Sequence, residues 1–472
     1  MKVAFHKSVV VLVLAACGLV IIVGGWILLR DTEPLPAEPT GDQWHSVNAP
    51  IGPNSTLDAQ IDRPSPVEGI SGRWRAANIS KPAGSEFDAQ VEKLSTLGYL
   101  QGYNPPPEDR GVTVHDPQRA YDGINLYTSG HAPEAVIMDM AGNVLHRWTY
   151  EIEKALPDIP DLPGNQNWQE RKSHWRRVHL YPNGDILALY DMICLLKLSR
   201  DSQLLWTFKV PYPHHHMQVS GDGRIFVLTK RIWERPEINP DDQVFEDYIT
   251  VLDSNGKFIT TFSLLESFRR SSYAFILDYM PRKGDLFHAN TIHILDGRHA
   301  DISPVYRKGN LLIAALYVNT MAIVDPQEQR VVWALRGDED RLWSGLHEPM
   351  LLDNANILVF DNNWTQDTNS RIIEFNPLTK QIAWMYQGTA QQPFFSRFCG
   401  TSQRLANGNT LITESENGRA FEVTPEGDIV WQYVTPHRAG KNNELIATLL
   451  HLNRIDRSDV NWLVTDPPDG GR

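Results

Sequence analysis

Residues 347 to 363 read HEPMLLDNANILVFDNN, from His347 to Asn363. The stretch contains an extended approach, a turn that ends at Asn356, and a short apolar strand, Ile357–Phe360, followed by an acidic and amide cluster. The same order of leading residue, turn and apolar strand recurs through most of the chain. This recurrence indicates a fold built from repeated β units.

Six such units follow Tyr121, and each offers up to four short strands separated by turn dipeptides. A four-stranded sheet of this size cannot bury both faces alone, but radial stacking around an axis buries each face against a neighbour. We therefore predict an all-β fold, a six-bladed β-propeller. The units are residues 123–148, 178–210, 214–262, 288–337, 347–388 and 399–433.

Two further features fit a closed ring. Tryptophans recur on the fourth strand of the units, where they suit the wide outer space between blades. Residues 444–455 predict a closing strand that pairs with the first blade; a seventh blade is the alternative. The fourth-strand tryptophans are Trp148, Trp206, Trp333, Trp384 and Trp431.

Composition limits the class of protein. The chain has 472 residues, of which 42% are hydrophobic and 21% charged, as in folded proteins. A net charge of −13 argues against nucleic acid as the main partner, because a phosphate backbone requires a basic face. Cys194 and Cys399 have no spacing typical of a disulfide framework or a zinc site. No convincing nucleotide-binding motif is present.

The N-terminal residues predict attachment to a membrane. Ser8–Leu29 is an almost unbroken apolar run, long enough to cross a bilayer, and we assign residues 1–30 to a transmembrane anchor with the bulk of the chain outside the cytoplasm. The alternative is a lipoprotein modified at Cys17, because Leu14–Cys17 resembles a lipoprotein cleavage box. Residues 31–110 predict a Pro-rich linker with a short helix over Phe87–Tyr99, and residues 111–465 the propeller.

The first strand of each propeller blade lines the central channel, so equivalent leading residues should meet at one channel mouth. These residues are Arg176, His215, His288, His347 and Gly400. Three imidazoles and a guanidinium in one place could bind an anion, with Arg177 or Arg397 adding positive charge. They could also bind a metal, although no supporting carboxylates are legible, or a neutral imidazole could act as nucleophile or general base. Each histidine alone is more often a core or surface residue with an ordinary partner.

Other residues have weaker signals. Phe394, Phe395 and Trp343 could form an aromatic wall for a ring-shaped substrate, although large apolar residues more often lie in the core. Asp361 could orient a histidine, or could simply end a strand. Of the run His214–His216, at most two side chains can face the channel.

From Gly123 to Val434 the chain resembles the bacterial arylsulfotransferases, periplasmic six-bladed propellers that pass a sulfuryl group from a phenolic ester to another phenol. The resemblance lies in Gly123–Tyr127 with Met138–Gly142, His288–Thr291, His347–Asn363, and Gln403–Thr413 with Phe421–Thr424. It implies that His347 is transiently sulfated and that His288 and His215 are further channel histidines. Arg176, Arg397, His216 and Phe395 are then the candidate substrate-binding residues.

The resemblance also implies the partners and the location. We expect a phenolic sulfate donor and a phenol acceptor, no nucleotide sulfate donor and no other cofactor, and an inner-membrane protein with its main domain in the periplasm. One departure stands out: where the family carries a sulfate-binding arginine, this chain has Leu316, for which Arg176, Arg298 or Arg397 could substitute. The alternative function is a non-catalytic propeller that binds a ligand or an envelope protein.

Overall fold

The computed structural model describes residues 73–76, 108–157, 171–209, 211–365, 369–440, 443 and 445–463. The expected transmembrane anchor, the Cys17 lipoprotein box and the helix over 87–99 lie outside these residues. Within the described part, no helix has the length and apolar character needed to cross a bilayer.

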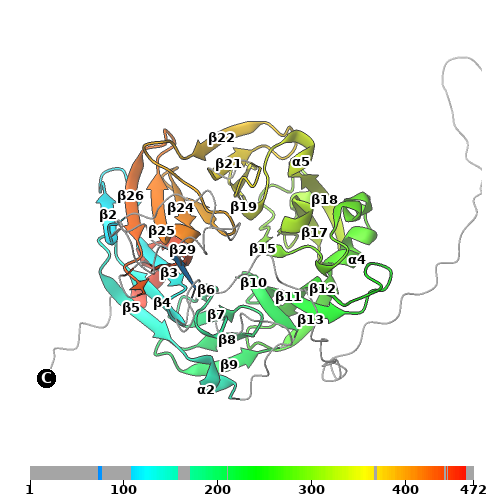
Figure 1. Cartoon of the computed structure of the whole chain (residues 1–472), viewed down its shortest axis with the longest axis horizontal. Helices are drawn as coiled ribbons and strands as arrows, with labels where there is room; N and C mark the ends of the chain where they lie inside the picture. Colours follow the sequence, from blue (N-terminus) through cyan, green and yellow to red (C-terminus); the bar gives the residue numbers. More distant parts are fainter. Residues whose placement is uncertain are drawn as a thin grey trace, which may run out of the picture. The chain divides into compact units, whose positions relative to one another are not determined.

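Six antiparallel sheets are arranged in a ring, each with its first strand nearest the axis (Figure 1). This confirms the predicted six-bladed propeller. Blade 1 contains β29 (Leu449–Ile455), β3 (Ile124–Ser129), β4 (Glu134–Met138) and β5 (Val144–Thr149). Blade 2 contains β6 (Arg177–Leu180), β7 (Ile186–Tyr190), β8 (Cys194–Leu198) and β9 (Leu204–Phe208). Blade 3 contains β10 (Tyr212–Val219), β11 (Ile225–Trp233), β12 (Val244–Leu252) and β13 (Phe258–Ser263), with β14 (Gly284–Asp285) paired to β12.

The remaining blades repeat this order. Blade 4 contains β15 (Ala289–Ile294), β16 (Leu311–Ala315), β17 (Thr320–Asp325) and β18 (Arg330–Arg336). Blade 5 contains β19 (Leu346–Leu351), β20 (Ile357–Asp361), β21 (Arg371–Phe375) and β22 (Ile382–Gln387). Blade 6 contains β23 (Thr401–Arg404), β24 (Thr410–Glu414), β25 (Arg419–Val423) and β26 (Ile429–Val434).

Both ends of the described propeller close the ring. The late strand β29 is the innermost strand of blade 1 and pairs with β3, as predicted for the closing strand. The early strand β2 (Gly111–His115) adds a fifth strand to the outside of blade 6 by pairing with β26 (Figure 1). Two distant parts of the chain therefore share each of the two blades at the seam.

Short elements connect the blades. The helices are α2 (Ile152–Ala155), α4 (Leu264–Arg269), α5 (Gly337–Asp340), η2 (Ala274–Tyr279), η3 (Pro304–Tyr306), η4 (Leu316–Val318), η5 (Ser415–Asn417) and η6 (Arg457–Leu463). A small three-stranded sheet joins β1 (Trp74–Ala76), β28 (Leu445–Ala447) and β27 (Arg438–Ala439).

Fourth-strand tryptophans join neighbouring blades. The indole N–H of Trp148 donates to the carbonyl of Gly184 in blade 2 (3.1 Å), and that of Trp431 donates to Met140 in blade 1 (2.9 Å). Trp384 donates in the same way to Pro425 of blade 6 (2.8 Å). Each aromatic ring covers apolar surface while its one polar atom finds a partner, which is why tryptophan suits this position.

The inner strands enclose a cavity of about 180 Å³. It is lined by residues of five inner strands, β6, β10, β15, β19 and β29, and therefore lies on the ring axis. Of the candidate functional residues, His216 and Arg177 line this cavity, whereas His215, His288 and His347 do not.

Candidate functional site

The leading ends of three inner strands are irregular at equivalent positions. β10, β15 and β19 each contain a register shift near their first residues. His215, His288 and Glu348 have positive φ angles of 52°, 48° and 49° at these places. A left-handed conformation costs a residue with a side chain about 1–2 kcal/mol, so surrounding contacts must hold it.

Those contacts are side-chain oxygens that accept from the backbone N–H of each left-handed residue. Asp191 Oδ1 accepts from His215 (3.0 Å) and Asp285 Oδ1 accepts from His288 (3.1 Å). In the third strand, Thr291 Oγ1 accepts from Glu348 (3.0 Å). In each of the three inner strands, a side-chain oxygen therefore holds one residue in the left-handed conformation. This conformation turns the side chains there in a direction that a regular extended strand would not give them.

His347 has a defined orientation and tautomer. Its Nδ1–H donates to Oδ1 of Asn362 (2.7 Å), and the amide N–H groups of Asn362 donate to the carbonyls of Ser396 (2.7 Å) and Cys399 (3.1 Å). The two carbonyls leave only the amide oxygen of Asn362 for the imidazole. Nε2 of His347 therefore carries a lone pair, and no residue within the described ranges occupies it.

The imidazole of His347 is neutral at neutral pH. Burial, with the positive charge of Arg176, lowers the pKa of His347 to about 3, against the opposing effect of the hydrogen bond that its ring donates to Asn362. Its side chain is 6% exposed. A neutral, oriented imidazole is a nucleophile.

His215 and His288 are in direct contact. Their ring centroids lie 4.5 Å apart with the rings nearly perpendicular. Nδ1 of His288 lies 2.7 Å from Oδ2 of Asp285, which also forms an ion pair with Lys230. Burial alone would raise the pKa of Asp285, but Lys230 and His288 hold it well below its ordinary value. An ionised Asp285 leaves Nε2 of His288 as the proton-donating or proton-accepting atom.

Arg176 adds positive charge next to His215 and His347. Its charge acts on both His347 and His215, whose pKa is lowered well below the ordinary value first by burial and then by Arg176 and His288. The backbone N–H of Arg176 donates to Leu189 (2.9 Å), which anchors the residue just before β6. Among the described residues no carboxylate pairs with its guanidinium. This unpaired cation beside two neutral imidazoles favours a bound anion.

The three side chains of the run His214–His216 contact different partners. Nδ1 of His214 lies 2.9 Å from Nδ1 of His215, and Nε2 of His214 lies 3.1 Å from a carboxylate oxygen of Asp247. Burial and the charge of Asp285 raise the pKa of Asp247 to about 8. His214 therefore points into the interior of blade 3, where it contacts both Asp247 and the ring of His215.

His216 lies in the axial cavity rather than beside His215. Its Nε2 is 3.3 Å from Oε1 of Glu348, and Arg177 forms a bidentate ion pair with the same carboxylate. His293 and His451 also line the cavity. The axial cavity thus holds a second group of charged and imidazole side chains next to the His347 group.

The remaining candidates are spread over other positions. Phe395 is fully buried, its N–H donating to Glu414 (2.8 Å), and Phe394 and Trp343 belong to apolar cores between blades. Arg397 lies in the loop before β23, where its N–H donates to Glu416 (2.6 Å). Arg298 is half exposed and paired with Asp296 and Asp353 in the turn after β15, at the far end of that strand from His288.

Two neighbours of the site, Asp361 and Leu316, make structural contacts. Asp361 does not contact His347; it pairs with Arg371 and accepts from the N–H groups of Ser344 and Asn363, while the adjacent Asn362 orients the imidazole. Leu316 packs in the core between blades 4 and 5, and its N–H donates to the carbonyl of His288 (3.4 Å).

The supporting residues were missed in the sequence. Asp191, Lys230, Asp247 and Asp285 come from segments whose pattern gives no sign of a role. The one available signal was the triplet Asp361–Asn363, whose polar side chains follow a buried strand directly. The other contacts depend on the β-bulges in β10, β15 and β19, which no turn dipeptide in the sequence predicts.

Comparison with known proteins gives a family. The family model described as Arylsulfotransferase (ASST) matches residues 180–436. The matched range includes His215, His288 and His347 and begins after Arg176. No protein with a curated description matches the chain.

Solved structures resemble the chain only distantly. A protein of unknown function from Bacteroides caccae is 14% identical, with a TM-score of 0.42, over 70% of this chain and 99% of that one. A streptogramin B lyase is 13% identical, with a TM-score of 0.40, over 82% and 99%. A virginiamycin B lyase from Staphylococcus aureus is 10% identical, with a TM-score of 0.39, over 73% and 98%.

Proposed function

Because the chain belongs to the arylsulfotransferase family, we propose that it passes a sulfuryl group from a phenolic sulfate ester to a phenol through a sulfated His347. The observation that carries the proposal is the orientation of His347. Asn362 holds Nδ1–H, burial keeps the ring neutral, and Nε2 is left as the reacting atom. An uncharged nucleophile can approach an anionic sulfate ester, which a carboxylate would repel.

The first half-reaction forms an N–S bond and breaks an S–O bond. Nε2 of His347 attacks sulfur, the ester oxygen leaves as a phenolate, and a proton from Nε2 of His288, whose other ring nitrogen faces Asp285, neutralises it. In the second half-reaction the same histidine removes a proton from the acceptor phenol. The phenol oxygen then attacks sulfur and the N–S bond breaks, which restores neutral His347. No nucleotide is required.

Arg176 supports the sulfate in this proposal. Charge develops on the sulfuryl oxygens and on the leaving phenol, so a fixed cation in a partly dry site stabilises the transition state more than it would in water. Arg176 takes this role because its guanidinium acts on both His215 and His347. It is our candidate to substitute for the arginine that Leu316 replaces, with Arg397 second.

The test compares wild type with His347→Ala on a chromogenic aryl sulfate. Wild type should release phenol, and without an acceptor it should stop after one turnover carrying the mass of a sulfuryl group on the peptide that contains His347. His347→Ala should release no phenol above background. His115→Gln, an exposed histidine on β2, is the matched control and should behave as wild type. Release that persists in His347→Ala would refute the sulfo-histidine.

Membrane attachment belongs to the same proposal. Residues 8–29 would tether the propeller to the outer face of the inner membrane, where phenolic compounds entering the envelope would reach it. A reporter enzyme active only in the periplasm, fused after Arg472, should be active. Loss of membrane association when Cys17 is changed to serine would favour the lipoprotein alternative.

A second function is the binding of an envelope protein, and the outer strands favour it. Apolar side chains are exposed on β5, β9, β13 and β22, the last strands of four blades. Edge strands with exposed apolar residues are sites where a partner can add a strand. The side chains are Val144, Leu145, Leu204, Leu205, Phe258, Ile259, Ile382 and Met385. Absence of phenol release from wild type with every aryl sulfate tested would favour this function.

A further inference from the structure

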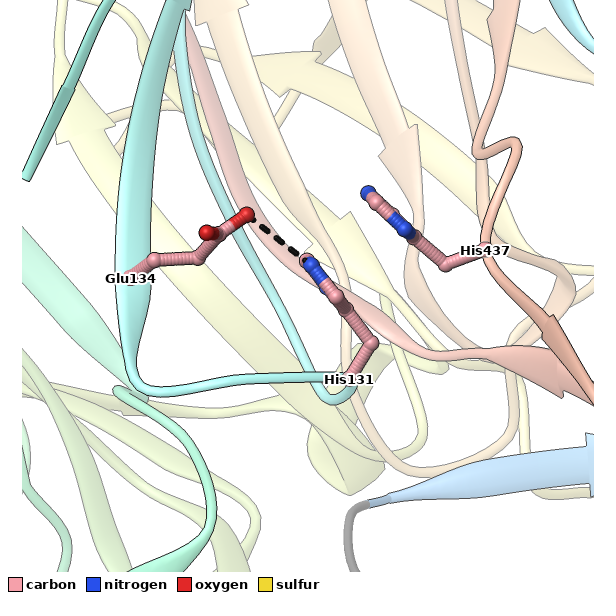
Figure 2. Close-up of side chains that lie close together, drawn as sticks. All are labelled: His131, Glu134 and His437. Atoms are coloured by element: carbon pink, nitrogen blue, oxygen red, sulfur yellow. Dashed lines mark ion pairs between the residues drawn. The ribbon is translucent and has the colours of Figure 1, made fainter. Parts of the chain in front are cut away.

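A group of metal-binding side chains lies outside the channel, where the two ends of the propeller meet. It consists of His131, Glu134 and His437, which approach one another from two chain segments (Figure 2). His131 lies in the turn between β3 and β4, and Glu134 begins β4 of blade 1. His437 follows the last strand of blade 6. The group therefore spans the seam at which the ring closes.

The three side chains offer one ligand atom each, and these atoms lie within 4.8 Å of one another. Nε2 of His131 is 2.9 Å from Oε1 of Glu134, and the rings of His131 and His437 stack with centroids 3.3 Å apart. An ion bound at about 2.0–2.1 Å from each ligand holds ligand atoms a little over 3 Å apart. To bind one ion the two rings would have to leave the stack and tilt toward each other, so that one nitrogen of each points at the ion.

The burial of one ring nitrogen is a second observation that points to a bound ion. Nε2 of His437 is buried and has no hydrogen-bond partner among the described residues. A buried nitrogen of this kind is costly unless something binds it.

A hydroxyl fixes the orientation of His131. Oγ of Ser129 lies 2.5 Å from Nδ1 of His131. When an ion replaces the proton on Nε2, Nδ1–H can donate to this hydroxyl, the usual arrangement for a metal-bound histidine. One group competes with an ion: Arg147 forms an ion pair with the same carboxylate of Glu134.

We propose that His131, Glu134 and His437 bind Zn²⁺ as a clip across the seam between blades 1 and 6. Two imidazoles and one carboxylate match zinc, whereas Mg²⁺ and Ca²⁺ prefer oxygen ligands alone. A water would complete the tetrahedron, because His131 keeps partial access to solvent. By joining two segments that only the fold brings together, the ion would stabilise the closed ring. The clip is independent of sulfuryl transfer.

The test titrates chelator-treated full-length protein with ZnCl₂ by calorimetry, with MgCl₂ in parallel. Wild type should bind about one equivalent of Zn²⁺ and no Mg²⁺. Ser129→Ala should weaken binding about tenfold, and His437→Asn and Glu134→Gln by more than that. His115→Gln is the matched control and should bind as wild type.

Arg147→Gln gives the sharpest result, because it frees Glu134 and should tighten zinc binding several-fold. Zinc should also raise the thermal midpoint of wild type and leave that of His437→Asn unchanged. Absence of zinc binding by wild type would overturn the proposal. So would unchanged binding in both His437→Asn and Glu134→Gln, or loss of binding in His288→Asn instead, which would assign the metal to the channel histidines.

Discussion

The ring nitrogen that His347 leaves without a proton is selected by its neighbour Asn362. Asn362 accepts from Nδ1–H because both of its own N–H groups are committed to carbonyls of the following loop. A reversed amide would place its oxygen against two carbonyl oxygens and lose both of those hydrogen bonds. Asn362 therefore positions the imidazole, while burial keeps His347 neutral over the physiological range.

Replacing Asn362 with aspartate should reveal this role in the pH profile. In wild type, the His347 pKa of about 3 means that the imidazole stays unprotonated between pH 5 and 7. Protonation of His347 should therefore not lower the rate of enzyme sulfation in this range. A carboxylate on Nδ1 would raise that pKa, so the variant should lose rate as pH falls through this range. Single-turnover phenol release measures it. Asn183→Asp, an exposed change in the turn after β6, should keep the wild-type profile.

Asp247 should make the protein less stable as pH rises. Its folded pKa is about 8 against an ordinary value near 3.8, so between these values the folded state keeps a proton that the unfolded state has lost. Stability from this group is therefore complete below the lower value and is lost as pH rises toward 8, with a slope of up to about 1.4 kcal/mol per pH unit. Urea unfolding at pH 5.5 and 7.5 should show a smaller loss in Asp247→Asn than in wild type. An identical loss in both proteins would contradict this assignment.

The residues of the site were predictable to different degrees. Repetition placed His215, His288 and His347 at equivalent positions, and the fold puts all three at the leading ends of inner strands. His216, predicted as a substrate-binding residue, faces Glu348 in the axial cavity, because the bulge in β10 directs neighbouring histidines differently. The sequence contains no local signal for a bulge held by an aspartate from a turn of the preceding blade.

At the scale of elements, neighbouring blades are joined by tryptophans on fourth strands and by turns shaped to receive them. Gly256, in the turn between β12 and β13, has φ +77°, and a Cβ there would lie 2.5 Å from the ring of Trp206. The turn dipeptides and tryptophans could be predicted from the sequence because each meets a local requirement that recurs from unit to unit. The contact between a particular tryptophan and a particular glycine could not be predicted, because the two residues belong to successive repeat units.

Gly256→Ala should therefore destabilise the protein far more than an equivalent change in an open turn. A left-handed backbone costs about 1–2 kcal/mol and the clash with Trp206 about 1–3 kcal/mol, so a loss of about 2–5 kcal/mol is expected. Gly309→Ala is the matched control, because Gly309 is also left-handed (φ +89°) and a Cβ there meets nothing within 4 Å. Urea unfolding of both variants measures the difference. Equal stability of the two would show that Trp206 moves aside without cost.

At the scale of the whole molecule, ring closure depends on strands from opposite ends of the propeller. The closing strand and six blades followed from the repeat, because a ring needs a terminal strand to complete its first blade. The added outer strand β2 was not predicted, since Gly111–His115 precedes the first repeat and has no partner nearby in the sequence. Long-range pairing of this kind is what a repeat pattern cannot specify.

Arg454 is the residue on which this closure most depends. It lies on β29, fully buried, and its guanidinium donates to Glu422 of blade 6 (3.0 Å) and to Asn125 of β3 (2.8 Å). Its backbone also exchanges two hydrogen bonds with the side chain of Gln403 on β23, both 2.9 Å. One side chain thus ties the closing strand to the blades on both sides of the seam.

Arg454→Ala should cost about 3–5 kcal/mol, because it leaves the carboxylate of Glu422 buried without its cation. Arg457→Ala is the matched control: Arg457 pairs with Asp122 at the same seam, but both side chains are more than half exposed, so its loss should change stability by less than about 0.5 kcal/mol. If the seam opens before the rest of the ring, amides of β29 and β3 in Arg454→Ala should exchange hydrogen faster than those of β16 and β17. Uniformly faster exchange over all blades would instead mean that the ring unfolds as one unit and that Arg454 stabilises it globally.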